Sequence, residues 1–363
     1  MYDQPAAIQR LSLPEGRRIL VISDIHGNLP YLRGLLAQTG FSGQDQLILD
    51  GDMLEKGAQS LDTLRFIMEL CKGGNVHPVC GNCDDWHIIF SSDRMDEHLL
   101  KYINWRRSGL LFDMCLSLGV EPAELESFAA VKPRLREAFP EIWDFLAALP
   151  HAIETERFIF AHAAVDPSKP LDAHSAAELV RCDRFMDLGR RFDKWVVVGH
   201  CPVMLYGTDK VCANPVIDRD SRIISIDGGC VLKDDGQLNA LIIPHRSSED
   251  FSFEAYDPFP VRRVLSDQAE GRRSYYIRWG DSRVRVLRRG EEFSLCRHER
   301  TGYEMEILTE YLFTGEDVTE CNDCTDYVLP LKRGDAVRVV EECSRGYFVK
   351  HQGFSGWYYG ELE

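Results

Sequence analysis

The sequence predicts an α/β fold with a two-sheet core flanked by helices, a helical insert and a small all-β module near the C-terminus. Three observations support this prediction. Short apolar runs within residues 1–245 end in polar or glycine-rich turns, which is typical of buried strands. From about 86 to 149 the apolar residues recur at helical spacing instead. Toward the C-terminus, short alternating runs separated by glycines indicate strands again.

The beginning of the chain reads as strand, loop, helix and strand. The first three expected strands are residues 18–23 (RILVIS), 46–50 (QLILD) and 76–80 (VHPVC). Leucines at helical spacing predict a helix at 29–38, and Gly40 follows it as a stop signal. Alternation of strands with a helix is typical of an α/β sheet.

Strands resume after the helical insert. Four further apolar runs are expected to form them: residues 158–162, 195–199, 223–226 and 240–243. The two groups of strands together suit two sheets with helices outside them.

We expect the chain to have three regions. Residues 1–245 form the first, which contains the insert, and residues 303–363 form the all-β module. Between them, 246–302 combines a proline-marked linker with an arginine-rich β segment. Residues 262–300 hold eleven arginines against six acidic residues, which fits either outward positions of strands or an anion-binding surface.

Composition excludes several classes of partner. Lys and Arg number 42 against 58 Asp and Glu, so the formal charge is −16, and nucleic acid is not an expected partner. No apolar run reaches the ~18 residues that would span a bilayer, and the N-terminus lacks the pattern of a signal peptide. We therefore expect a cytoplasmic protein without membrane contact, whose twelve cysteines are reduced thiols. The Cys321-x-x-Cys324 pair has no second pair, so a structural zinc site there is not favoured.

Polar residues follow five of the predicted strands at the point where each strand ends. They are Asp24, His26, Asp52, Asn82, His162 and His200. Open α/β sheets place their ligand sites at these strand ends, and a buried carboxylate or histidine without a partner is costly. Taken alone, Asp24 could cap the next helix, and His162 could be a core histidine with satisfied hydrogen bonds. As a set, they predict a site for two cations about 3.5–4 Å apart.

The series D-x-H, GD, GN, H and GH resembles the calcineurin-like metallophosphoesterase superfamily over residues 17–245. The stretches DIHGN, GDMLEKG, FLAALP before IFAHAAV, and GHCPV followed by IDGGC are most similar to its phosphoprotein phosphatase branch, which includes symmetrical dinucleoside tetraphosphatases. This resemblance implies a metallophosphoesterase β-sandwich in which the first region is the catalytic domain.

The resemblance also implies a ligand set and a mechanism. Asp24 and His26 would bind the first metal, Asp52 would bridge both, and Asn82, His162 and His200 would bind the second. The two divalent or trivalent ions would be manganese, iron, zinc or nickel, with manganese favoured in vitro. A hydroxide bridging them would attack phosphorus in line. Pro202 stands where other branches of the superfamily have a further histidine.

The sequence departs from the phosphatase branch at the acid that protonates the leaving group. The usual G-N-H-E histidine is Cys83 here, followed by Asp84, and the aspartate that orients it is Glu55. A thiol of pKa ~8.5 replaces poorly an imidazole near ~6.5, and general acid catalysis is typically worth ~100- to 10,000-fold. Asp84, Asp85 or His87 are alternative acids. The GNCD variant also resembles small bacterial phosphodiesterases.

Two cationic residues are candidates for binding substrate phosphate. Lys56 stands at the family's arginine, but as a point charge it lacks the bidentate fork, and it could equally be a solvated surface lysine. Arg181 lies in a stretch similar to the family's phosphate-binding arginine region, with the register off by one.

The C-terminal module resembles bacterial Src-homology-3-like domains. The patterns L-x-x-G-x-x-V and V-x-x-x-G-x-x-GW match Leu331, Gly334, Val337, Val349, Gly353, Gly356 and Trp357. The resemblance implies an SH3-like barrel for self-association, peptide contact, substrate placement or covering of the active site. Trp357 is expected in its core, with Tyr358 and Tyr359 alternating outward, and a groove lined by all three is the alternative.

We therefore expect a metal-dependent phosphoric ester hydrolase, similar to phosphoprotein phosphatases, that acts on a phosphorylated small molecule or a phosphoprotein. Phosphodiesterase or dinucleoside polyphosphate hydrolase activity is the first alternative, because the missing histidine disfavours alkyl leaving groups. The second alternative is a metal-binding regulatory or scaffold protein whose catalysis has decayed. Retention of all six expected ligands favours the enzyme.

Overall fold

The computed structural model describes residues 4–91, 95–314 and 318–363, and the chain divides into two compact units. The first consists of residues up to Pro202, 215–232 and 236–257. The second consists of 203–214, 233–235 and 258–363. Two short segments of the region predicted as catalytic thus belong to the second unit. The division into three regions at 245 and 302 stays a prediction.

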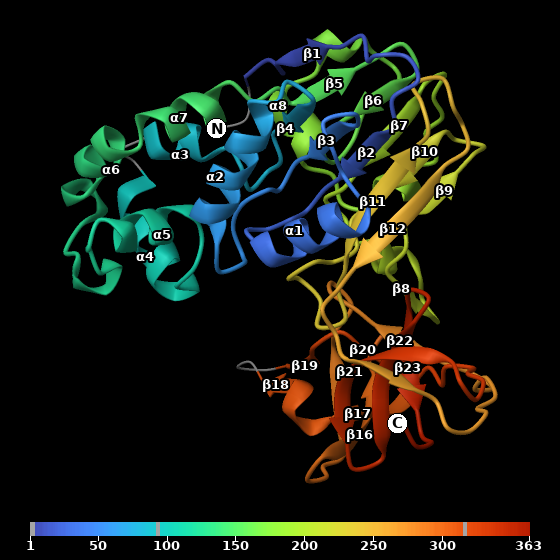
Figure 1. Ribbon diagram of the computed structural model, residues 1–363. Coiled ribbons are helices and arrows are strands. Elements are labelled where there is room, and N and C mark those ends of the chain that lie inside the picture. The colour runs from blue at the N-terminus through green and yellow to red at the C-terminus, as the bar shows by residue number, and fades with distance from the viewer. Residues whose placement is uncertain (1–3, 92–94, 315–317) are drawn as a thin grey trace. The chain divides into compact units, whose positions relative to one another are not determined.

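Two sheets form the centre of the first unit (Figure 1). The strands of the six-stranded sheet are, in spatial order, β1 (Ile8–Arg10), β5 (Ala152–Glu154), β6 (Phe158–Phe160), β7 (Trp195–Val198), β10 (Ile223–Ser225) and β9 (Val216–Asp218). Those of the five-stranded sheet are β12 (Ser252–Tyr256), β11 (Leu238–Ile243), β2 (Ile19–Ile22), β3 (Gln46–Asp50) and β4 (Val76–Val79). Strands β2, β3 and β4 run parallel, as do β6, β7 and β10.

Alternate side chains of these strands fill two different cores. Val21 and Ile48 pack with Phe160, Val197 and Ile224 of the other sheet in one fully buried cluster. Their neighbours along the same strands, such as Leu20, Ile22, Leu47 and Leu49, pack instead against helices. Successive residues of a strand point to opposite faces, so continuously apolar strands are needed where both faces of a sheet are covered.

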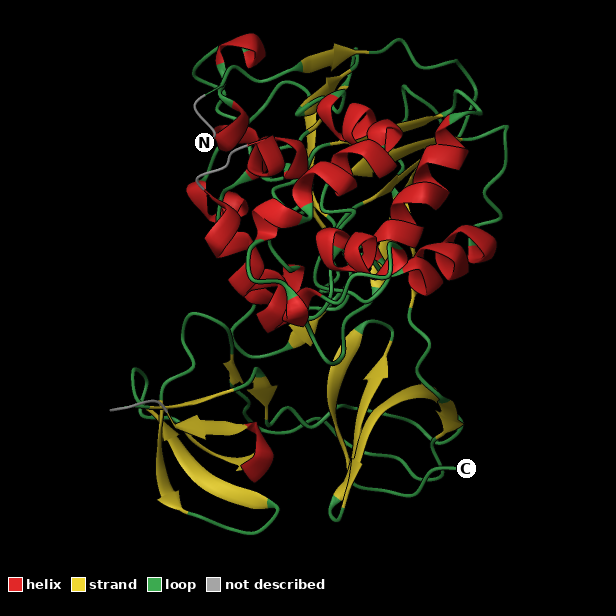
Figure 2. Cartoon of the chain, turned by 90° about the vertical axis from the view of Figure 1, so that its left-hand side faces the viewer, coloured by secondary structure: helices red, strands yellow, loops and turns green. Residues whose placement is uncertain are grey.

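Helices cover the outer faces of both sheets, as the red elements of Figure 2 show. Those on the five-stranded side are α1 (Leu29–Gln38), α2 (Ser60–Cys71), and the insert of α3 (Trp86–Ser91), α4 (Asp96–Arg106), α5 (Leu110–Ser117), α6 (Lys132–Ala138) and α7 (Pro140–Ala147). The short α8 (Ala176–Val180) packs on the six-stranded side. The predicted α/β class, the two-sheet core and the helical insert agree with this architecture.

Strands joined by loops make up most of the regular structure of the second unit (Figure 2). Its five-stranded sheet has the order β13 (Val261–Arg263), β21 (Ala336–Cys343), β22 (Gly346–His351), β23 (Phe354–Tyr358) and β8 (Val211–Cys212). A three-stranded sheet contains β15 (Val284–Arg288), β16 (Phe293–His298) and β17 (Glu304–Leu308), and two strand pairs are β14 (Tyr276–Ile277) with β20 (Cys324–Thr325) and β18 (Leu312–Thr314) with β19 (Thr319–Cys321).

An all-β C-terminal region is thus present, but its predicted SH3-like barrel is not confirmed. Within the described residues the five-stranded sheet is open, because its edge strands β13 and β8 do not pair with each other. The expected arrangement of its aromatic residues is also wrong in part. Tyr358 is fully buried in the core with Val337 and Val349, whereas Trp357 is half-buried and Tyr359 is exposed.

Ion pairs account for part of the arginine-rich segment. Acidic partners are found for Arg262, Arg288, Arg297 and Arg300, which pair with Glu342, Glu306, Glu304 and Asp281. These pairs favour outward strand positions over an anion-binding surface. Across the described residues, none of the helices has the length and apolar character needed to cross a membrane.

Candidate metal centre

The predicted ligands lie on loops that leave the carboxyl ends of parallel strands. Asp24, Asp52 and Asn82 follow β2, β3 and β4, and His162 and His200 follow β6 and β7. Backbone hydrogen bonds connect these loops: the amide of Asp24 donates to the carbonyl of Gly51 (3.0 Å), and the amide of Gly199 donates to the carbonyl of His162 (2.8 Å). Parallel strands therefore bring residues distant in sequence to one edge of the core.

Asp52 is the centre of the resulting cluster. Its Oδ1 lies 3.3 Å from Nε2 of His162, and its Oδ2 lies 3.8 Å from Nε2 of His26. Oδ1 of Asp24 approaches the same nitrogen of His26 to 3.7 Å. The rings of His162 and His200 meet edge to face, with centroids 5.2 Å apart. Asp24, His26, Asp52, His162 and His200 are thus brought together.

Asn82 belongs to the same cluster through its neighbours. The amide of Cys83 donates to Oδ1 of Asp52 (2.8 Å), and the Asn82 side chain donates to the sulfur of Cys83 (3.3 Å). The Asn82 Oδ1 is buried and has no hydrogen-bond partner among the described residues. The other five predicted ligands therefore lie around Asp52.

Several buried acceptors in this cluster lack a donor, which is the pattern that bound cations would satisfy. Nδ1 of His26 contacts the carbonyl of Leu54 (3.3 Å) and Nδ1 of His162 contacts that of Asp50 (2.9 Å), so in the neutral rings each Nδ1 carries the proton and each Nε2 presents a lone pair. Within the described residues, Asp24 Oδ1, Asn82 Oδ1 and His162 Nε2 have no hydrogen-bond partner. Burying such acceptors is costly unless a cation or proton lies between them.

The atoms that could bind metal also form two overlapping sets, each with the dimensions of a cation site. In one set, ligand atoms of His26, Asp52 and Cys83 all lie within 4.8 Å of one another, and in the other those of Asp52, His162 and His200 do. Asp52 is common to both. The residues present therefore fit two cations that share one carboxylate.

Burial and the local charges perturb the titration of every group in the cluster. Burial lowers the pKa of His26 to about 3, and Lys56 adds to this effect. Burial also acts to lower the pKa of His162, but the carboxylates of Asp52 and Asp24 outweigh it and raise that pKa to about 10. For Asp24, burial and the nearby Asp227 raise the pKa well above its usual range. Strong perturbation of this kind is typical of functional sites.

The site stores backbone strain. Of the eleven non-glycine residues with positive φ in the described part of the chain, six are predicted site residues: Asp24, His26, Asp52, Glu55, Lys56 and His200. Such residues cost free energy and cluster at active sites, where the surrounding structure holds them in place. Gly199 has a different role, because a Cβ there would collide with the Asp24 carboxylate.

Two predicted catalytic residues lie outside the ligand cluster and bind backbone or insert groups. Asp84 accepts the amides of Gly81 (2.9 Å), Leu54 (3.1 Å) and Met53 (3.3 Å), so it holds the two ligand loops together. Glu55 accepts the amide of Leu110 (2.7 Å) and the hydroxyl of Tyr102 (2.9 Å), both in the helical insert. Both carboxylates are buried.

The two predicted phosphate-binding residues are near the cluster. The Lys56 ammonium lies 3.4 Å from Nε2 of His26; burial acts to lower its pKa, but the nearby Cys83, Asp52 and Asp24 outweigh this effect and raise it. The alternative of a solvated surface lysine does not fit this position. Arg181 is exposed, and its charge acts to lower the pKa of His200, less strongly than burial, His162 and Lys56 do.

Sequence reasoning missed Asp227. This buried carboxylate follows β10, accepts the amide of Gly229 (2.8 Å), and perturbs Asp24. The signal was present, since Asp227 stands directly after a predicted strand as the six ligands do. The other candidate acid Asp85 instead belongs to a separate buried group with Cys80 and His151, where it accepts the thiol of Cys80 (3.2 Å).

Comparison with known proteins agrees with this geometry. The family model for calcineurin-like phosphoesterases matches residues 17–218, more than half of the chain. The chain belongs to the calcineurin-like phosphoesterase family. The expectation of a metal-dependent phosphoric ester hydrolase is confirmed at the level of this family, whose members generally bind two divalent metal ions.

Curated relatives are similar over part of their length. The chain is 31% identical over 154 residues to a symmetrical bis(5'-nucleosyl)-tetraphosphatase of Pectobacterium atrosepticum, covering 38% of this chain and 50% of that protein. The chain is 46% identical over 70 residues to the protein of the same name from Serratia proteamaculans, covering 19% of this chain and 24% of that protein. The chain thus spans half or less of the length of these relatives. A solved protein serine/threonine phosphatase from Saccharomyces cerevisiae is 11% identical, with a TM-score of 0.43, over 71% of this chain and 85% of that one.

Proposed function

We propose that this protein hydrolyses phosphoanhydride or aryl phosphate bonds with two metal ions, and that dinucleoside polyphosphates are its favoured substrate class. The proposal rests on the buried acceptor atoms around Asp52 that have no hydrogen-bond donor among the described residues. In addition, the Asp52 carboxylate belongs to two sets of ligand atoms, each with the dimensions of a cation site. The tetraphosphatase relatives support the substrate class. Cations bound there would lower the pKa of a coordinated water and offset charge on the phosphate oxygens.

The chain's own residues would hold and orient these components. Asp52 would join the two ions, and the carbonyls of Leu54 and Asp50 would keep the Nε2 atoms of His26 and His162 directed at them. Lys56, already beside His26, and the exposed Arg181 would supply positive charge to an anionic substrate in a protein of charge −16. Binding and orientation of this kind can supply much of the barrier reduction in phosphoryl transfer.

The absence of a histidine acid supports anhydride over alkyl ester substrates. Cys83 occupies the position of that acid, and burial raises the pKa of its thiol well above the usual range. A phosphoanhydride or phenol leaving group needs little protonation, whereas a serine alkoxide needs a proton in the transition state. Phosphoserine hydrolysis is therefore the second candidate. All six predicted ligands are present, which disfavours a decayed scaffold.

A substrate panel tests the proposal. Manganese-loaded protein should cleave diadenosine tetraphosphate and bis-p-nitrophenyl phosphate at least ~100-fold faster than a phosphoserine peptide, because general acid catalysis is worth that much to an alkyl leaving group. Asp52→Asn should reduce all turnover by more than ~1000-fold, since the metals contribute several kcal/mol. Asp113→Asn, which alters a half-buried carboxylate on α5, is the matched control. Equal rates on all substrates would contradict the leaving-group argument, and metal binding without turnover would favour a scaffold.

We also propose that the C-terminal unit mediates self-association or peptide contact, as its resemblance to SH3-like domains implies. Sedimentation of the full chain over a range of concentrations would detect self-association. A monomer at every concentration would restrict the unit to contacts with other molecules.

A further inference from the structure

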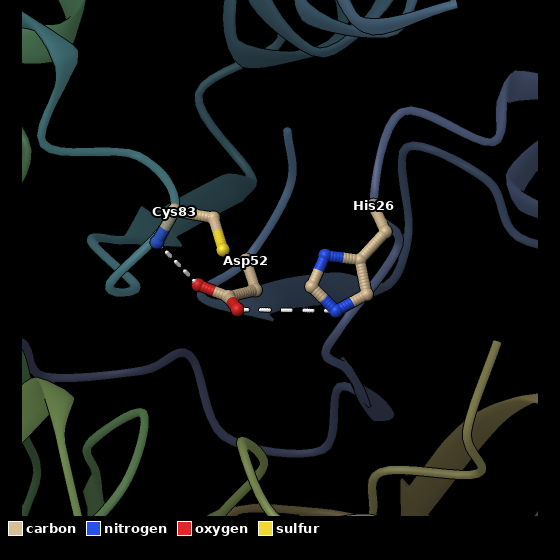
Figure 3. A group of neighbouring side chains, drawn as sticks. All are labelled: His26, Asp52 and Cys83. Atoms are coloured by element: carbon tan, nitrogen blue, oxygen red, sulfur yellow. Dashed lines mark hydrogen bonds and ion pairs between the residues drawn. The ribbon is translucent and has the colours of Figure 1, made fainter. Parts of the chain in front are cut away.

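The sulfur of Cys83 lies among predicted metal ligands. Its Sγ, a nitrogen of His26 and a carboxylate oxygen of Asp52 are mutually within 4.8 Å (Figure 3). In Figure 3 the sulfur is directed from its own loop toward the space between Asp52 and His26. A cation between these two residues would therefore have a sulfur atom within reach.

Two hydrogen bonds fix this position. The amide of Cys83 donates to Oδ1 of Asp52 (2.8 Å), and the Asn82 side chain donates to Sγ (3.3 Å). Since Asp52 and Asn82 are themselves predicted ligands, the thiol is held by the same loops that form the centre. Turning the thiol away would break its contact with Asn82, while the backbone amide keeps the loop against Asp52.

An independent observation points to a cation site on this side of Asp52. Asp24 is 1% exposed, and its Oδ1 lies 3.7 Å from Nε2 of His26 while lacking any hydrogen-bond partner among the described residues. Both atoms carry lone pairs, because Nδ1 of His26 is occupied by the carbonyl of Leu54. The Lys56 ammonium contacts Nε2 of His26 (3.4 Å), but Asp24 Oδ1 keeps no partner among the described residues, and a buried carboxylate oxygen of this kind calls for a positive charge beside it.

We propose that Cys83 binds the first cation as a thiolate, so that Asp24, His26, Asp52 and Cys83 form a mixed oxygen, nitrogen and sulfur site. On binding, the thiol releases its proton to solvent and the sulfur donates an electron pair to the metal. This inference rests on the proposed dinuclear centre. The second cation, held by Asp52, Asn82, His162 and His200, has only oxygen and nitrogen ligands.

The two sites then differ in metal preference. Thiolates favour zinc, cobalt, iron and cadmium over manganese, whereas carboxylate and amide oxygens accept manganese readily. The first site should therefore select a thiophilic metal, and the second should remain permissive. A sulfur that is bound to metal also cannot serve as the proton donor, which agrees with the preference proposed for anhydride and aryl leaving groups.

Cobalt substitution tests the inference by spectroscopy. The full-length protein titrated with cobalt(II) should develop a sulfur-to-metal charge-transfer band that saturates at one equivalent, while total binding reaches two. Cys83→Ser should lose the band and bind the first cobalt at least about 100-fold more weakly, beyond the range seen for loss of an outer partner. Zinc-loaded wild-type protein should show one sulfur scatterer at ~2.3 Å in X-ray absorption, a measurement that requires no variant.

Other thiols supply the controls. Sγ of Cys321 and Cys324 are 3.9 Å apart and could bind cobalt themselves, and Cys71 is a half-buried thiol on α2. Cys324→Ser and Cys71→Ser should both keep the band. Two bound cations without sulfur ligation, or a band that survives Cys83→Ser, would overturn the role of Cys83 and leave the proposed function standing. Absence of cation binding would overturn both.

Discussion

Replacing Glu55 tests how the helical insert is attached to the metal loops. The carboxylate is 3% exposed and accepts the Leu110 amide and the Tyr102 hydroxyl. Burial raises its pKa from 4.5 to about 7, against the opposing effect of these two hydrogen bonds. Because the folded-state pKa is the higher one, the protonated form is favoured by folding. The stabilisation from this group is complete below pH 4.5 and is lost as the pH rises through 7.

The magnitude follows from the shift. A change of roughly 2.5 units at 1.36 kcal/mol per unit corresponds to about 3 kcal/mol of stability lost between pH 4.5 and 8. Glu55→Gln resembles the protonated carboxyl and does not titrate, so its unfolding free energy should lack this loss. Glu55→Ala also does not titrate, and it should be roughly 2–4 kcal/mol less stable than Glu55→Gln at every pH, because it leaves two donors without their acceptor.

Chemical denaturation of wild type and both variants at pH 5 and pH 8, at constant metal concentration, measures these differences. Other buried carboxylates, such as Asp50 and Asp84, have raised pKa values too, but they are common to all three proteins and cancel in the comparison. If wild type and Glu55→Gln lose stability in parallel as the pH rises, the buried carboxylate is not the cause and the reasoning is wrong.

Three further predictions concern the centre itself. Gly199→Ala should lower metal affinity at least ~10-fold, because its methyl would displace the Asp24 carboxylate. Isothermal titration measures the affinity. An unchanged value would contradict the close approach of Gly199 to Asp24. Lys56→Met should raise KM for an anionic substrate more than it lowers kcat, whereas Lys56→Arg should keep or lower KM. Steady-state kinetics measure both constants. Unchanged constants in both variants would show that Lys56 does not bind substrate. Chelation should lower the melting temperature, since a metal at 100 times its Kd stabilises the fold by about 2.7 kcal/mol, and an unaltered calorimetric scan would show that no metal is bound.

The sequence predicted the elements whose local signal is strong. The helix at 29–38 and the strand at 46–50 have the predicted bounds, because apolar periodicity and Gly40 define them locally. Strands β1 and β5 were missed, since three residues are too few to show a period. Part of the expected linker is β12, which forms only by pairing with β11, a contact that its own sequence does not encode.

The candidate site likewise contains some features that have a local sequence signal and others that depend on contacts between distant residues. The six ligands could be predicted because each directly follows an apolar strand, and the structure brings them together. The environment of Glu55 could not be predicted, because Tyr102 and Leu110 are about fifty residues away in sequence and reach it only through the fold of the insert. The position of the Cys83 sulfur likewise depends on Asp52, which lies on another strand's loop.

The central claim is that two cations share Asp52. Anomalous diffraction from crystals grown with manganese or cobalt tests this most directly. Two peaks about 3.5–4 Å apart, one on each side of the Asp52 carboxylate, are the predicted result. No peak within this cluster, or ions held elsewhere while Asp24, His26 and His162 keep their present contacts, would contradict it.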